Sequence, residues 1–338
     1  MKRITSILIV FFLLGCTSPG PKIYIANEGD GTITVIDSST LEVVDTIKLA
    51  GMPHNVNVDP KGRFFYATNH EGEEDEPGEM HHVPFLRVLD VKTNKLIGSV
   101  PMKEIAAHVV PSRQRDVVYV SREGGNTVLE IDIIKGLILR AFKTGDGPHG
   151  FVLSNDDKTL YVPNMKSNDV SIVNIATGKE ERINIMLDGM SCETPVAMGI
   201  SEDDRFSFVT CGKSFDIYQI NNKERKVIAR VALEKGEFPG PIQIPVHPHN
   251  KYLYVPDMRH DVVHKISIEP FALLKDIPSG KGAHGIAFSA DGKIAYVTNT
   301  WENTVSVIDL DKEEIVKTIS VGSKPNGIAL QGGKNQGW

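Results

Sequence analysis

The sequence predicts an all-β fold built from repeated units, and three observations support this prediction. A phrase returns about every 40 to 50 residues, most clearly where 147–150 (GPHG) leads to 160–164 (LYVPN) and where 282–285 (GAHG) leads to 295–299 (AYVTN). Short alternating runs of Val, Ile and Tyr are separated by turns rich in Gly, Asn and Asp. No long stretch has helical periodicity. Four short antiparallel strands per unit are typical of a propeller blade.

The number of blades follows from the recurring strand end. Versions of this end occur at seven positions: Asn27, Asn69, Arg122, Asn164, Cys211, Asp257 and Asn299. Since each repeat buries its apolar face only against its neighbours, the copies form one domain. We therefore predict a seven-bladed β-propeller of four-stranded blades.

The two ends of the repeat region are out of phase with each other. The first strand, at 23–26 (IYIA), opens in the middle of a unit, and 326–330 (NGIAL) repeats the inner-strand phrase with no blade after it. We expect the C-terminal inner strand to join the N-terminal strands in one blade, which leaves no open sheet edge. The predicted propeller covers 22–330, followed by a tail at 331–338.

The motifs resemble a known repeat family. Residues 296–299 (YVTN) followed by 304–309 (TVSVID) are similar to the YVTN-type repeat of bacterial and archaeal seven-bladed propellers, and the similarity covers 22–330. The fold is related to the propellers of nitrous oxide reductase and the haem d1 proteins. This resemblance implies the fold but no single activity, because the group ranges from surface proteins to metal and porphyrin binders.

The N-terminus has the features of a lipoprotein export signal. Residues 1–15 contain Lys2, Arg3 and an apolar stretch too short to span a bilayer, and Cys16 follows Leu-Leu-Gly. By resemblance to the lipobox, Cys16 becomes the lipidated first residue, 16–21 form a short tether, and the membrane is a partner through this anchor. The expected location is the cell envelope, periplasmic or associated with the outer membrane. A free cysteine after a plain signal peptide is the alternative.

Composition and missing motifs limit the function. The net charge of −6 makes nucleic acid an improbable partner. The sequence has no Gly-x-Ser-x-Gly elbow, no Cys-x-x-Cys-His haem attachment site and no Gly-rich phosphate loop. Whether the protein is an enzyme stays open at this stage.

Histidines gather at one end of the predicted channel. His54, His108, His149 and His284 occupy one equivalent position, where inner strands begin, and His70 follows a second strand at the same end. The other equivalent positions hold Val196, Ile242 and Asn326. Imidazoles gathered with methionines and cysteines favour copper, with zinc or iron next. A noncovalent porphyrin or an anion is an alternative ligand, and Pro-His-Gly as ordinary repeat turns is the simplest explanation.

Two further features at this end have open interpretations. The insertion between His70 and Pro84 contains His81 and His82, which are candidates for a second metal site or a lid, although a solvated acidic loop has the same composition. Cys192 and Cys211 are a candidate disulfide, a thiolate pair for a soft metal, or two unrelated thiols. An oxidising envelope favours the disulfide.

Three functional hypotheses follow. The first is an envelope lipoprotein that binds a metal, most simply copper, through His54, His108 and His149, with His284 or His70 as a further ligand. The second is a noncatalytic scaffold that holds a protein or glycan partner on a propeller face. The third is an oxidoreductase or a cofactor-maturation protein of the haem d1 kind.

Overall fold

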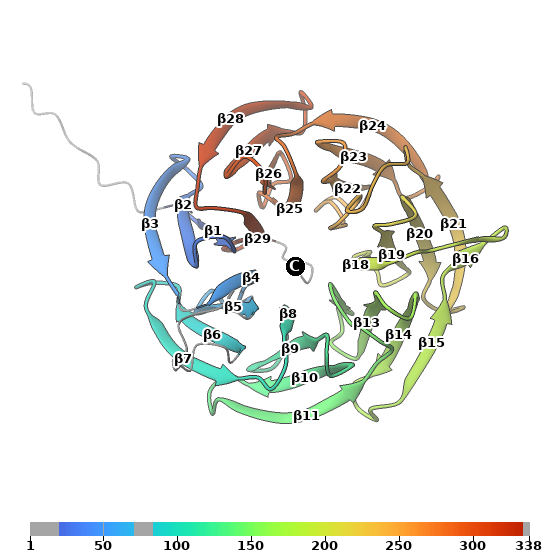
Figure 1. Ribbon diagram of the computed structural model, residues 1–338, viewed down its shortest axis with the longest axis horizontal. Helices are drawn as coiled ribbons and strands as arrows, with labels where there is room; N and C mark the ends of the chain where they lie inside the picture. The colour runs from blue at the N-terminus through green and yellow to red at the C-terminus, as the bar shows by residue number, and fades with distance from the viewer. Residues whose placement is uncertain (1–19, 50, 71–83, 334–338) are drawn as a thin grey trace, which may run out of the picture.

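The protein forms a ring of seven β-sheets around a central axis (Figure 1). The computed structural model describes residues 20–49, 51–70 and 84–333. The predicted all-β, seven-bladed propeller is confirmed. No segment of the described chain forms a helix that could cross a membrane. Cys16, His81 and His82 lie outside the described residues.

Blade one contains both ends of the repeat region. Its strands, from the axis outwards, are β29 (Pro325–Leu330), β1 (Lys22–Asn27), β2 (Thr32–Asp37) and β3 (Glu42–Lys48). β29 pairs antiparallel with β1, and Tyr24 lies opposite Ala329. The predicted closure of the ring by the C-terminal strand is therefore confirmed.

The next three blades each contain four consecutive strands. Blade two comprises β4 (Met52–Val58), β5 (Phe64–His70), β6 (Phe85–Asp90) and β7 (Leu96–Pro101). Blade three comprises β8 (Ala106–Pro111), β9 (Val117–Arg122), β10 (Thr127–Asp132) and β11 (Leu137–Lys143). Blade four comprises β12 (Val152–Leu153), β13 (Thr159–Asn164), β14 (Asp169–Asn174) and β15 (Glu180–Asn184).

The remaining blades follow the same order with two irregularities. Blade five comprises β18 (Pro195–Ile200), β19 (Phe206–Cys211), β20 (Asp216–Asn221) and β21 (Lys226–Ala232), and the hairpin of β16 (Met186–Leu187) and β17 (Met190–Ser191) precedes it. Blade six comprises β22 (Tyr252–Asp257), β23 (Val262–Ser267) and β24 (Ala272–Pro278). Isolated bridges at Pro241 and Val246 stand where its inner strand runs. Blade seven comprises β25 (Ala283–Phe288), β26 (Ile294–Asn299), β27 (Thr304–Asp309) and β28 (Glu314–Ser320).

The hydrophobic core lies between the blades. Inner strands such as β8 and β25 are buried along their whole length, whereas outer strands such as β3 are mostly exposed. One apolar cluster fills each junction between neighbouring blades. At the junction of blades one and two, the rings of Tyr24 and Phe65 stack with centroids 4.0 Å apart. Face-to-face burial of this kind fixes the relative positions of adjacent blades, and with them the inner strands that carry the histidines.

The Asn of the strand-end phrase has a structural role. Asn27 Nδ2 donates to the hydroxyls of Thr32 (2.9 Å) and Thr34 (2.8 Å), which ties the second strand of the blade to the third. The same pair of bonds to side chains five and seven residues later is made by Asn164 and Asn299. In blade six the pair is replaced by Asp257 and His264, whose Oδ2 and Nε2 are 3.2 Å apart.

Candidate metal centre

A break in strand pairing sets the direction of the histidine side chains. The pairing of β4 with β5 shifts between Pro53 and Asn55, which leaves His54 in a bulge. The same shift falls at His108 in β8 and at His284 in β25. Because a bulge turns one side chain away from the regular alternation, the repeat places each of these imidazoles in the same way.

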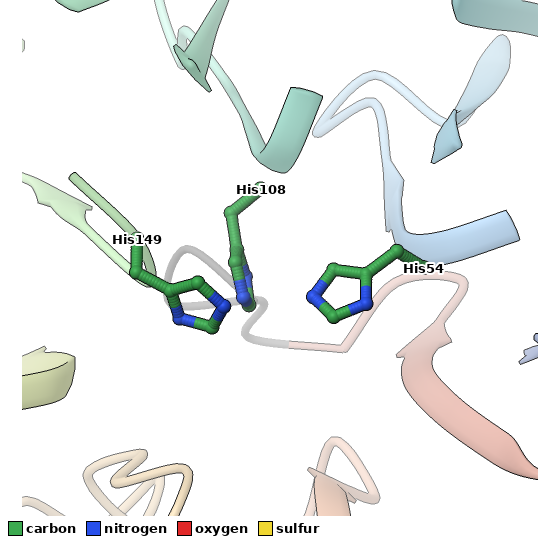
Figure 2. A group of neighbouring side chains, drawn as sticks. All are labelled: His54, His108 and His149. Carbon is green, nitrogen blue, oxygen red and sulfur yellow. The ribbon is translucent and has the colours of Figure 1, made fainter. Parts of the chain in front are cut away.

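Three of the imidazoles meet. His54, His108 and His149 come from three successive blades and point into one space at the channel mouth (Figure 2). Each offers one ring nitrogen within 4.8 Å of those of the other two. The ring centroids lie 5.5 Å (His54 and His108), 5.7 Å (His54 and His149) and 4.6 Å (His108 and His149) apart. All three residues are buried, with exposed fractions of 7%, 2% and 8%.

His149 is fixed by the inner strand of blade five. Gly150 donates its N–H to the carbonyl of Val196, and a Cβ at Gly150 would lie 3.0 Å from that of Ala197, so the chain approaches closely here. His149 Nδ1 lies 3.1 Å from the same Val196 carbonyl. A carbonyl only accepts, so Nδ1 carries the proton. Burial lowers the pKa of His149, opposed by the charge of Glu123.

His54 is held by groups from both ends of the chain. Its Nδ1 lies 3.2 Å from Oε1 of Glu28, the residue after β1, and Asn326 Nδ2 lies 3.1 Å from the same nitrogen. Asn326 also donates to Glu28 Oε2 at 3.0 Å. Metal-binding histidines commonly donate their second ring N–H to a carboxylate in this way, which fixes the tautomer. In that arrangement Nε2 of His54 is the nitrogen for an ion.

The other histidines predicted for the site lie elsewhere or outside the description. His284 occupies the equivalent position in blade seven, but among described residues the close group contains only the other three. Its Nδ1 is buried without a hydrogen-bond partner in the described chain, and burial lowers its pKa to about 3. His70 ends β5, and its side chain is not described. His81 and His82 are outside the described range.

A disulfide lies next to the strand segment that contacts His149. Cys192 and Cys211 are joined, with an S–S distance of 2.03 Å and Cα atoms 5.3 Å apart, and both are buried. Pro195 pairs with Cys211, and Val196 follows it in the chain. The bond therefore braces the segment whose carbonyl orients His149.

The two blades that follow the three imidazoles present apolar side chains at the equivalent positions. Val196, Ile242 and Met258 form a small buried cluster there. Two of these residues occupy positions equivalent to the histidines, as the repeat alignment predicts. The arrangement is thus asymmetric: imidazoles and carboxylates on one side, aliphatic and thioether side chains on the other. Three imidazoles at this spacing can bind a transition metal and leave further coordination positions for another ligand.

The sequence matches a propeller family over its C-terminal part. Residues 192–332 match the family described as YNCE-like beta-propeller. The match supports the YVTN-type resemblance, and the preceding blades complete the same seven-bladed ring. No characterised protein matches the sequence significantly.

Solved structures show the same fold at low sequence identity. Hydrazine synthase from Kuenenia stuttgartiensis is 17% identical, with a TM-score of 0.72 over 84% of this chain and 90% of that chain. The periplasmic gluconolactonase of Pseudomonas aeruginosa is 14% identical (TM-score 0.73, 92% and 99%). A putative 6-phosphogluconolactonase from Bacteroides fragilis is 13% identical (TM-score 0.73, 94% and 99%). At these identities the likeness shows the fold alone, so the function of this protein has to be argued from its own residues.

Proposed function

We propose that the protein is a cell-envelope lipoprotein that binds a metal ion at the channel mouth of its propeller. Copper is the preferred candidate for this ion, followed by zinc or iron. The observation that carries this proposal is the group of three buried imidazoles, His54, His108 and His149, whose nitrogens lie within 4.8 Å of one another. Imidazole suits copper, zinc and iron, and copper(II) is the most tightly bound of the divalent ions in such sites.

The geometry needs only a small adjustment to hold an ion. Metal–nitrogen bonds of about 2.0–2.1 Å place two ligand nitrogens no more than about 4 Å apart. We expect rotations of the rings to make this change, because the three side chains share one space. His149 and His54 donate hydrogen bonds from their remote ring nitrogens to the Val196 carbonyl and to Glu28, and these bonds restrict the rotations to orientations that favour binding.

The envelope location rests on the sequence. The lipobox-like segment ending at Cys16 supports a lipid anchor, and the Cys192–Cys211 bond is consistent with an oxidising compartment. On this proposal the metal-binding propeller is tethered to a membrane. Storage, transfer or redox use of the ion are all compatible with three imidazole ligands.

Metal content tests the proposal directly. The protein is exported to a periplasm as the Cys16→Ser variant, purified, and analysed by mass spectrometry and paramagnetic resonance with and without added copper. We expect about one copper per chain, lost when His54, His108 and His149 are all replaced by glutamine. The control is His249→Gln, in a turn at the opposite end of an inner strand. Wild-type protein that binds no stoichiometric metal would refute the proposal and leave a scaffold for a protein or glycan partner.

A further inference from the structure

The second carboxylate at the channel mouth, Glu123, faces a ligand nitrogen. Because Nδ1 of His149 donates to the Val196 carbonyl, the lone pair of the neutral ring is on Nε2. Oε1 of Glu123 lies 3.7 Å from this nitrogen. A carboxylate oxygen and an unprotonated ring nitrogen therefore lie near each other, an arrangement that a shared cation stabilises.

Glu28 and Glu123 are placed differently. Glu28 contacts Nδ1 of His54 and accepts a hydrogen bond from Asn326. It therefore orients the ring through the nitrogen that would not bind the ion. Glu123 is beside the nitrogen that would bind the ion. Its side chain is 20% exposed, compared with 10% for that of His149. It can therefore move towards the three imidazoles, although it stands outside their close group.

We propose that Glu123 is the fourth ligand of the metal and makes the site selective for divalent ions. This inference rests on the proposed function. The observed 3.7 Å is slightly longer than the separation of two ligand atoms bound tetrahedrally to one ion at about 2.0–2.2 Å, which is about 3.3–3.6 Å. A carboxylate is a hard, anionic ligand, so it stabilises copper(II) or zinc more than copper(I). Neither His284 nor His70 is needed to complete the coordination.

The test compares Glu123→Gln with wild-type protein. The substitution keeps the size of the side chain and removes its charge. Copper(II) and copper(I) affinities are measured separately by competition with chelators of known affinity. We expect copper(II) binding to weaken by at least about tenfold and copper(I) binding to change little. Each tenfold loss of copper(II) affinity relative to copper(I) affinity raises the copper reduction potential by about 59 mV. Voltammetry measures this shift independently.

The controls separate this inference from the proposed function. Glu193→Gln removes another carboxylate, one that pairs with Lys213 in an exposed ion pair, and its copper affinities should equal those of wild type. If wild-type protein binds no metal, the proposed function and this inference both fail. If wild type binds copper and Glu123→Gln binds both ions equally well, only the role of Glu123 is wrong. If His284→Gln binds copper(II) more weakly than wild type and Glu123→Gln binds it as tightly as wild type, the fourth ligand is His284.

Discussion

Breaking the Cys192–Cys211 disulfide should lower the melting temperature of the propeller measurably. The bond joins residues 19 positions apart. A crosslink stabilises a protein mainly by restricting the unfolded chain, and for a loop of this length the chain-entropy model gives about 3 kcal/mol. Both cysteines are buried in the cluster between blades four and five, so their substitution would also remove packing contacts.

The expected shift in melting temperature follows from the size of the ring. Globular proteins gain about 2.1 cal/mol/K of unfolding entropy per residue. For a propeller spanning 22–330 this is about 0.65 kcal/mol/K. A loss of about 3 kcal/mol therefore corresponds to a decrease of about 5 °C in the melting temperature. The decrease is modest because a large cooperative unit spreads the loss over many residues.

Calorimetry of one protein in two redox states measures this effect without a packing change. The chain is reduced while unfolded, refolded in the presence of reductant, and compared with the oxidised form, with free thiols counted in each. The Cys192→Ala/Cys211→Ala variant is the control, and its melting temperature should not respond to reductant. Equal melting temperatures for fully reduced and fully oxidised protein would refute the reasoning.

Two other predictions concern the blades. Burial acts to lower the pKa of His264, but hydrogen bonds to Asp257 and a second carboxylate raise this pKa above its usual value. The charged ring therefore stabilises the fold below pH 6.5. This stabilisation is lost as the pH rises through the raised pKa. The urea midpoint of wild type should exceed that of His264→Gln by more at pH 5.5 than at pH 9. The same difference in midpoint at both pH values would contradict the ion pairing. Gly199→Ala places a Cβ 2.1 Å from the carbonyl oxygen of Ile244, and we expect a loss of about 1–3 kcal/mol or more by urea unfolding. Gly98→Ala, whose nearest contact is 3.7 Å, should cost less than half as much, and equal losses would argue against the clash.

The sequence was sufficient to predict the fold because each blade repeats a local pattern. The strand ends at Asn27, Asn164 and Asn299 coincide with the observed ends of β1, β13 and β26. The closure of the ring was predictable from the phase of 23–26 and 326–330. The inner strand of blade six is less regular than the others, because the segment from Pro241 to Val246 pairs only through isolated bridges. Pro241 and Pro245 interrupt this segment, because a proline has no backbone N–H to donate to the sheet.

The candidate site was predictable only in part. The repeat places His54, His108 and His149 at one equivalent position, which sequence alone reveals. The contributions of Glu28 and Glu123 are not visible in the repeat, because each belongs to the blade before the histidine that it contacts. A usable signal exists, since both residues directly follow the second strand of their blade. The Val196 carbonyl could not be predicted, because a backbone contact between blades leaves no trace in residue identity.

The contacts of His54 link the site to the completion of the propeller. Glu28 follows β1, the first strand of the described propeller, and Asn326 belongs to β29, its last. Three successive blades supply the imidazoles, but His54 acquires both of its neighbours only when β29 joins β1. A chain that stops before residue 325 still contains every histidine of the group and lacks one of the two side chains that orient the first of them. Binding at this site would therefore distinguish a finished, closed ring from an incomplete one.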